Sequence, residues 1–210
     1  MQTHIERAQA DLRSLAYARL GARDLFSGQQ LAFMAQACAD VPKELIGIGD
    51  VGEQNNLDVG RFMEDKKDEL PVYRNDPIGR VVVELLNMGK CREFLSGLMD
   101  GEYYIRRCQA NVLRQGSFIG KHIDTYSNLD YRYSCVIQFG KEYEGGEFFI
   151  EADGIEREIK THYADFLVNR CEIPHGVRTV KAGNRTSLVF FLSKTPLSMP
   201  NHNHADIRRT

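Results

Sequence analysis

The spacing of apolar residues changes its period about halfway along the chain. In the first half, apolar side chains recur every three or four positions from Ile5 to Leu20 and again from Gln29 to Cys38. Positions three and four apart share one face of a helix, so we predict a helix in each of these runs. The dipeptide Asp76-Pro77 is typical of a helix start, and the apolar pattern extends this third helix towards Leu98.

From Tyr103 onwards, short runs of β-branched and aromatic residues alternate with turns. The predicted strands span residues 104–114, 131–139, 146–151, 158–161, 164–168, 178–180 and 187–192. Short strands separated by glycine-containing turns are typical of an antiparallel sandwich or barrel. We therefore predict an α+β fold with a mainly β core and N-terminal supporting helices.

The length of 210 residues and a hydrophobic content of 42% favour one domain with one buried core. We predict a domain over residues 1–195, with helical support in 1–102 and the β core in 103–195. Residues 196–210 have almost no periodic apolar positions, which predicts a flexible tail. Residues 47–58 are rich in Gly, Asn and Asp, which predicts a loop.

Charge and cysteine content narrow the class of protein. The 27 basic and 29 acidic residues give a formal net charge of -2, so no global field attracts a polyanion, and we expect no nucleic-acid partner. The five cysteines form no C-x-x-C pair and are odd in number, which favours reduced thiols. No segment has the ~20 apolar residues of a membrane span, and the charged N-terminus is unlike a signal peptide. We expect a cytoplasmic protein without a membrane partner.

A possible metal site begins with the sequence G-K-H-I-D-T-Y. His122 and Asp124 lie two positions apart, so on a strand both side chains project from one face. His175, in E-I-P-H-G-V, is the natural third ligand if a returning strand brings it beside them. Two imidazoles and one carboxylate with open positions opposite suit a ferrous centre that binds a cosubstrate and O2. The alternatives are a polar surface strand and a loop histidine bonded to the backbone.

The other histidines fit a metal site less well. His162 lies at a predicted strand boundary and His4 on the first predicted helix, so we expect both to contact solvent. His202 and His204 alternate in the predicted tail, which offers no rigid frame for a catalytic ion.

Arg185 lies ten residues after His175, and on a strand Arg185 and Ser187 would share one face. A guanidinium beside a hydroxyl can bind a carboxylate through charge-assisted hydrogen bonds. The pair therefore predicts an anchor for a dicarboxylate cosubstrate. An exposed arginine at a strand start is the alternative.

These fragments, in this order, resemble the Fe(II)- and 2-oxoglutarate-dependent oxygenase superfamily, in particular its prolyl-4-hydroxylase-like group. The resemblance covers roughly residues 104–193 and includes H-I-D, E-G-G-E-F-F, Y-A-D-F-L-V-N, P-H-G-V and R-x-S. It implies a double-stranded β-helix, a jelly-roll or cupin-like fold. It also implies a hydroxylase that uses Fe(II), 2-oxoglutarate and O2 and releases succinate and CO2.

The resemblance also implies roles for single residues. His122, Asp124 and His175 match the iron ligands, which are the catalytic centre, and Arg185 with Ser187 match the clamp for 2-oxoglutarate. Gln138 is a further candidate for binding 2-oxoglutarate, because it matches a place where relatives have a hydrogen-bonding side chain. The alternative is that Gln138 is a polar residue that faces outward. Related halogenases have Gly or Ala in place of the carboxylate, so Asp124 predicts hydroxylation.

The substrate is less well defined by the sequence. The run from Arg106 to Asp124 is similar to that of small bacterial oxygenases acting on free amino acids, so we expect a small, amino-acid-like substrate. A peptidyl, prolyl-type hydroxylase is the first alternative, and a cupin-like metalloenzyme that does not use 2-oxoglutarate is the second. A nucleic-acid repair enzyme and a non-catalytic binding protein fit less well. The oligomeric state stays open.

Several polar segments are candidates for contact with the substrate. Candidate lids are residues 47–58, 63–69 and 125–131. The side chains considered for substrate or cosubstrate contacts are those of Asn111, Arg114, Tyr126, Asp130 and Arg132.

Overall fold

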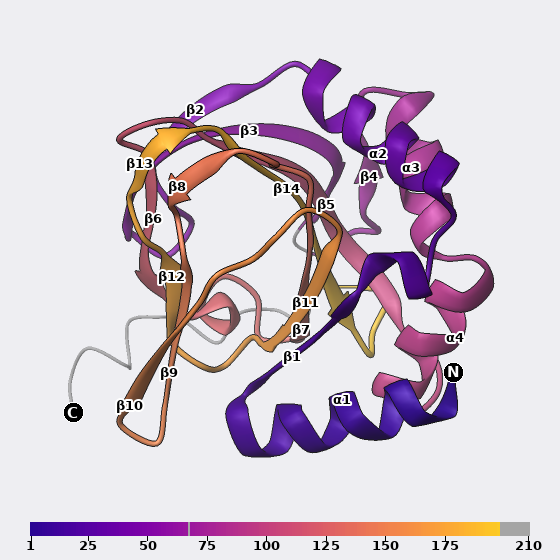
Figure 1. The fold of residues 1–210 in the computed structure, drawn as a ribbon. Helices are drawn as coiled ribbons and strands as arrows, with labels where there is room; N and C mark the ends of the chain where they lie inside the picture. Colours follow the sequence, from indigo (N-terminus) through magenta and orange to yellow (C-terminus); the bar gives the residue numbers. More distant parts are fainter. Residues whose placement is uncertain (67, 198–210) are drawn as a thin grey trace.

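The computed structural model describes residues 1–66 and 68–197, and Figure 1 shows antiparallel strands that curl around a central space, with helices packed against one outer side. The helices are α1 (Gln2–Leu15), α2 (Gly28–Asp40), α3 (Ile78–Leu86) and α4 (Gly89–Leu98), with short 3-10 turns η1 (Ala22–Asp24) and η2 (Asp124–Tyr126). The strands are β1 (Tyr17–Gly21), β2 (Glu44–Ile48), β3 (Gln54–Glu64), β4 (Val72–Tyr73), β5 (Tyr104–Leu113), β6 (Phe118–His122), β7 (Tyr131–Gln138), β8 (Tyr143–Gly145), β9 (Phe148–Ala152), β10 (Ile155–Ile159), β11 (Asp165–Arg170), β12 (His175–Val177), β13 (Val180–Gly183) and β14 (Arg185–Ser193).

The strand order explains how two walls face each other. One wall runs β1-β11-β7-β14-β5-β3, and the other runs β6-β12-β9-β10. Strand β3 joins the walls because it pairs with β5 and also with β6. Strands β2 and β4 extend the first wall from β3, while β13 and β8 form a separate pair. The predicted double-stranded β-helix with supporting helices is confirmed.

Along the strands, side chains alternate between the main hydrophobic core and the space between the two walls. In β14, Leu188, Phe190 and Leu192 belong to the main core cluster, together with buried residues of all four helices. The intervening residues Val189 and Phe191 belong to a second cluster on the opposite face of the sheet. Successive side chains of a strand point to opposite faces, so one strand serves both regions.

The first 102 residues contain more than supporting helices, because β1 to β4 also lie there. The predicted loop at 47–58 is in part strand, since β3 begins at Gln54 and pairs with four other strands along its length. Leu57 and Val59 are buried beside Leu113 and Val177. This packing and the backbone pairing outweigh the turn propensity of the local Asn and Asp residues.

The predicted helix from Asp76 to Leu98 is two helices, α3 and α4. Met88 between them has an extended backbone with φ -129°, and Gly89 has a positive φ of 54°. The chain therefore turns where the apolar pattern alone predicts continuation. The predicted tail lies outside the described residues from position 198 onwards, as do His202 and His204.

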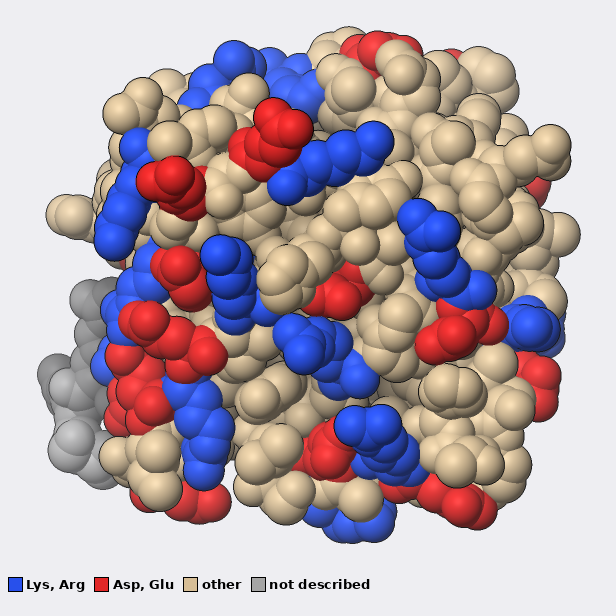
Figure 2. Space-filling view, in the orientation of Figure 1, with Lys and Arg blue, Asp and Glu red and all other residues tan. Residues whose placement is uncertain are grey.

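None of the helices in the described residues is both long and apolar enough to cross a bilayer. All five cysteines are buried and unpaired. On the face shown in Figure 2, acidic and basic side chains of the described residues are interspersed, without a broad area of one sign.

Candidate iron and 2-oxoglutarate site

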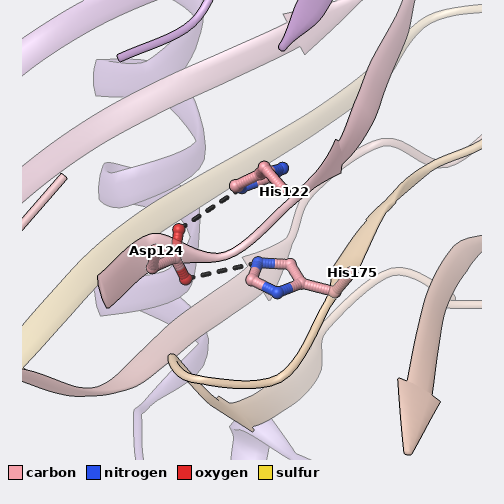
Figure 3. Close-up of side chains that lie close together, drawn as sticks. All are labelled: His122, Asp124 and His175. Carbon is pink, nitrogen blue, oxygen red and sulfur yellow. Dashed lines mark ion pairs between the residues drawn. The ribbon is translucent and has the colours of Figure 1, made fainter. Parts of the chain in front are cut away.

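The three predicted metal ligands come together at one end of the second wall. His122 ends β6, His175 begins β12, and the two residues are direct partners in the antiparallel pairing of these strands. Asp124 is the first residue of η2, and its carboxylate lies between the two imidazoles (Figure 3). The distances are 3.3 Å from His122 Nε2 to Asp124 Oδ1 and 3.2 Å from His175 Nε2 to Asp124 Oδ2.

The backbone selects the tautomer of both histidines. His122 Nδ1 lies 2.8 Å from the carbonyl oxygen of Gly120, and His175 Nδ1 lies 2.8 Å from that of Ile173. A carbonyl oxygen only accepts, so each Nδ1 donates its hydrogen, and in the neutral ring Nε2 carries a lone pair. Both Nε2 atoms therefore present lone pairs towards the carboxylate.

This arrangement of acceptors fits a cation. One ligand atom from each of the three residues lies within 4.8 Å of the others. Asp124 Oδ2 is buried and has no hydrogen-bond partner among the described residues. Three acceptors that face one another repel unless a proton or a metal ion lies between them, and two imidazoles with one carboxylate are a common ligand set for Fe(II). The residues present thus fit a divalent metal ion.

The ionisation of the group follows from the same contacts. Burial by itself raises the pKa of Asp124, but the charge and hydrogen bonds of the two adjacent imidazoles in their protonated form outweigh it and hold this pKa well below its ordinary value of 3.8. Burial likewise opposes protonation of His122, yet the hydrogen bond and charge of Asp124 raise its pKa above 6.5. The carboxylate is therefore ionised at neutral pH and available to a metal.

The local geometry differs in one respect from the sequence interpretation. Asp124 does not continue the strand of His122, because the chain enters η2 at that residue. The carboxylate reaches the imidazoles through this turn rather than by strand alternation. Gly176 beside the third ligand is also required, since a Cβ there would lie 2.7 Å from the backbone oxygen of Ile119 and from the ring of Phe149.

The triad opens into a cavity of about 160 Å³ between the two walls. Arg185 and Ser187 of β14 line the same cavity, and they are 2% and 0% exposed. Arg185 Nη1 donates to Ser187 Oγ over 3.5 Å, whereas Nε has no hydrogen-bond partner among the described residues. Apolar side chains line the same cavity, among them Val136 and Val189.

Arg185 is a buried cation that lacks an acidic neighbour. Among the described residues, no carboxylate oxygen lies within 4.0 Å of its guanidinium. Burial lowers its pKa, and the phenol of Tyr143 partly offsets this effect. Since an arginine stays charged in proteins, the group needs a counter-ion, and a bound carboxylate fits that need.

Gln138 is placed differently from the other candidates. It is fully buried, and its Nε2 donates to the carbonyl oxygen of Thr186 over 3.0 Å. Its Oε1 accepts from the hydroxyl of Thr161 over 3.3 Å. Its side chain is not among those that line the cavity, so its contact with 2-oxoglutarate stays a prediction.

The polar residues suggested for substrate contact are mostly elsewhere. Asn111 lines the cavity, whereas Arg114 pairs with Asp58 at the surface. Tyr126, Asp130 and Arg132 are absent from the lining of this cavity.

Sequence reasoning missed Arg107 and Gln109, which line the cavity from β5. The signal was present as an alternation of polar and apolar residues, because Cys108 and Ala110, which alternate with them, are buried in the main core. In an open sheet the polar face of such a strand meets water. In a barrel it faces the interior.

Comparison with known proteins identifies the family. The sequence model of the 2OG-Fe(II) oxygenase superfamily matches residues 108–193. The crystal structure of an oxidoreductase of the 2OG-Fe(II) oxygenase family from Burkholderia pseudomallei is 36% identical, with a TM-score of 0.84 over 91% of this chain and 91% of that chain. The chain belongs to the 2OG-Fe(II) oxygenase family. It is a 2-oxoglutarate-dependent dioxygenase, and its cofactor and cosubstrates are Fe(II), 2-oxoglutarate and O2.

More distant structures share the fold of this oxygenase. A Pseudomonas putida prolyl-4-hydroxylase is 14% identical, with a TM-score of 0.65 over 91% of this chain and 99% of that chain. HygX from Streptomyces hygroscopicus, with nickel and 2-oxoglutarate bound, is 8% identical, with a TM-score of 0.67 over 90% of this chain and 86% of that chain. No curated protein sequence matches the chain.

Proposed function

We propose that this oxygenase hydroxylates an unactivated C–H bond of a small metabolite, a free amino acid or a close derivative. In this proposal His122, Asp124 and His175 bind Fe(II), and Arg185 with Ser187 binds the distal carboxylate of 2-oxoglutarate. We retain Gln138 as a further cosubstrate contact. We place the reaction in the cytoplasm.

One observation carries the assignment of these residues. The acceptor triad and the guanidinium without an acidic neighbour line the same cavity, one from the second wall and the other from the first. A metal ion satisfies the triad, and a carboxylate satisfies Arg185. A molecule with a metal-binding end and a carboxylate end meets both needs, and 2-oxoglutarate is such a molecule.

The chain prepares the site in three ways. Backbone carbonyls orient the two imidazoles, the low pKa of Asp124 keeps the carboxylate ionised, and buried apolar side chains limit the access of water. When bound, Fe(II) with 2-oxoglutarate and O2 supplies the oxidant for the substrate, while succinate and CO2 are released. The presence of the carboxylate at position 124 supports hydroxylation as the outcome.

The cavity supports a small substrate. Its volume of about 160 Å³ and its two walls suit a compact molecule better than an extended chain. The interspersed charges on the face in Figure 2 offer no basic surface there for a polynucleotide. Membership of the family rules out the alternative of a cupin-like enzyme that does not use 2-oxoglutarate.

A peptidyl, prolyl-type hydroxylase is the second candidate. Ile48, which lines the cavity, is 73% exposed. Exposed apolar side chains beside a cavity favour contact with a larger partner. This alternative predicts turnover of peptides but not of free amino acids.

Anaerobic titration with Fe(II) and 2-oxoglutarate tests the site. We expect a metal-to-ligand charge-transfer band in the wild-type protein and its loss in His175→Ala, which removes a metal ligand. The matched control His162→Ala removes an exposed histidine and should keep the band. A normal band and normal succinate release in His175→Ala would refute the ligand assignment. A succinate-release screen of free amino acids and peptides then separates the two substrate classes.

A further inference from the structure

The first wall of the cavity carries a second guanidinium, that of Arg107 on β5. Its side chain is 16% exposed and lines the same cavity as the triad. Its Nε donates to Gln109 Oε1 over 2.8 Å, and Gln109 Nε2 donates to Asn111 Oδ1 over 2.7 Å. Arg107 is therefore held in place by a row of polar side chains along one face of the strand.

The two arginines lie far apart along this wall, on the neighbouring strands β14 and β5. In the pairing of β14 with β5, Arg185 is opposite Leu113, whereas Arg107 is opposite Phe191. Six residues of β14 separate these two points, which is roughly 20 Å along an extended strand. Each guanidinium can thus bind its own carboxylate without competition from the other.

Arg107 differs from Arg185 in having an acidic partner. Asp50, in the turn between β2 and β3, forms an ion pair with Arg107, and its side chain is 56% exposed. Burial lowers the pKa of Arg107, but the charge of Asp50 outweighs this effect and raises it. The pair therefore consists of the Arg107 guanidinium, which lines the cavity, and the Asp50 carboxylate, which lies on an exposed turn.

We propose that Arg107 binds the carboxylate of the primary substrate and that Asp50 then pairs with the ammonium group of the same molecule. The proposal rests on the proposed function and names its substrate class as free α-amino acids. A substrate carboxylate can replace that of Asp50 on the guanidinium, because Asp50 loses little on returning to solvent at its exposed turn. The released Asp50 carboxylate is then available to a cationic group at the cavity mouth. A residue inside a peptide has neither charged group, so the pair also excludes peptidyl substrates.

The test compares three forms of each L-amino acid: the free molecule, its C-terminal amide and its N-acetyl derivative. Binding is measured by isothermal titration to the Mn(II)-loaded protein with 2-oxoglutarate, and turnover is measured by succinate release. We expect binding and turnover of at least one free amino acid and a loss of about 10- to 100-fold for its amide and N-acetyl forms, the range of a charge-assisted hydrogen bond.

Variants of Arg107 and Asp50 test which residue binds each charged group of the substrate. Arg107→Met should raise the Kd of the free amino acid about 10- to 100-fold. Arg107→Lys, which keeps the charge, should recover part of the loss, and Asp50→Asn should reduce the preference for the free amine. The control Arg114→Met removes an exposed arginine outside the cavity and should change neither value. Circular dichroism and the melting temperature report whether each variant is folded.

Three results would overturn the inference. Equal binding of the free amino acid and its amide would show that no carboxylate is recognised. An unchanged Kd in folded Arg107 variants would place recognition elsewhere. Turnover of peptides alone would exclude the substrate class. Failure of the function itself has a different signature, because the wild-type protein would then bind neither Fe(II) nor 2-oxoglutarate.

Discussion

Each histidine of the triad uses one ring nitrogen for the fold and keeps the other for the site. The hydrogen bonds from Nδ1 to Gly120 and Ile173 fix both rings. The remaining Nε2 atoms lie next to the carboxylate of Asp124. Burial alone would raise the pKa of this carboxylate, but the two imidazoles lower it. In the proposed site, protons and metal ions therefore bind through the same atoms, and the two compete.

This competition predicts a pH dependence of metal binding. Burial opposes protonation of His122, but Asp124 raises its pKa above 6.5, so a proton occupies this site up to a higher pH than in a free histidine. A metal ion needs the neutral ring. We expect Mn(II) affinity to increase with pH through this raised pKa and to level off above it, as measured by electron paramagnetic resonance titration. His162→Ala should leave the profile unchanged, and a flat profile in the wild-type protein would contradict the prediction.

A second prediction at this scale concerns Arg185. Its guanidinium has no acidic neighbour among the described residues, so its replacement removes the proposed partner of the cosubstrate carboxylate without breaking an ion pair. Arg185→Met should raise the 2-oxoglutarate KM by about 10- to 100-fold, from a lost charged hydrogen bond of about 1.5 to 3 kcal/mol. Mn(II) affinity should not change. An unaltered KM in this variant would move the anchor to another residue.

At the scale of elements, one carboxylate ties the end of β3 to the turn that carries Asp124. Asp65 Oδ1 accepts from Arg106 Nη2 over 2.5 Å, and Oδ2 accepts from Asn128 Nδ2 over 2.6 Å and from the hydroxyl of Tyr131 over 2.9 Å. The backbone N–H of Asn128 donates in turn to the carbonyl oxygen of Asp124 over 3.3 Å. The end of strand β3 is thereby linked to the turn of Asp124 through side-chain hydrogen bonds of Asp65 and a backbone hydrogen bond of Asn128.

Removal of this carboxylate should therefore affect both stability and metal binding. Arg106 is fully buried and Asp65 is 11% exposed, so Asp65→Ala breaks a buried ion pair. We expect a loss of roughly 3 kcal/mol in the free energy of unfolding and weaker Mn(II) binding. The neighbouring Glu64→Ala breaks the exposed pair with Arg74 and should cost less than about 1 kcal/mol. Urea unfolding measures both variants, and equal losses would contradict the role of Asp65.

The whole molecule keeps its five thiols inside the core. Burial raises the pKa of Cys38 from 9.0 to about 12, and it raises the pKa of the other four as well. A thiol that stays protonated in the folded chain but ionises in the unfolded chain stabilises the fold below pH 9 and loses this effect as the pH rises towards 12.

Thiol labelling tests this property of the folded chain. At pH 8 we expect no rapid reaction of the native protein with a disulfide reagent and reaction of all five cysteines after unfolding in guanidinium chloride. Stability should also decline above pH 9, less so in Cys38→Ala than in the wild-type protein. Rapid labelling of one cysteine in the native protein would show that part of the core opens.

Local patterns were enough for the class of fold and for the candidate ligands. The change from helical spacing to alternation predicted helices followed by a β core, since periodicity depends only on neighbouring residues. The short motifs around His122 and His175 predicted the chemistry because they combine metal-binding residue types with strand boundaries. The divided helix at Met88 and strand β3 were not predicted, because a turn and a pairing decided them against the local pattern.

Only the tertiary structure decided which residues far apart in the sequence come into contact. His122 and His175 became partners through the register of β6 and β12, and Asp50 reached Arg107 across 57 positions. The pairing of β5 with β14 placed the polar face of β5 towards a cavity instead of water. Residue types and periods are properties of the sequence itself, whereas these contacts exist only once the strands are paired and the barrel encloses their inner face.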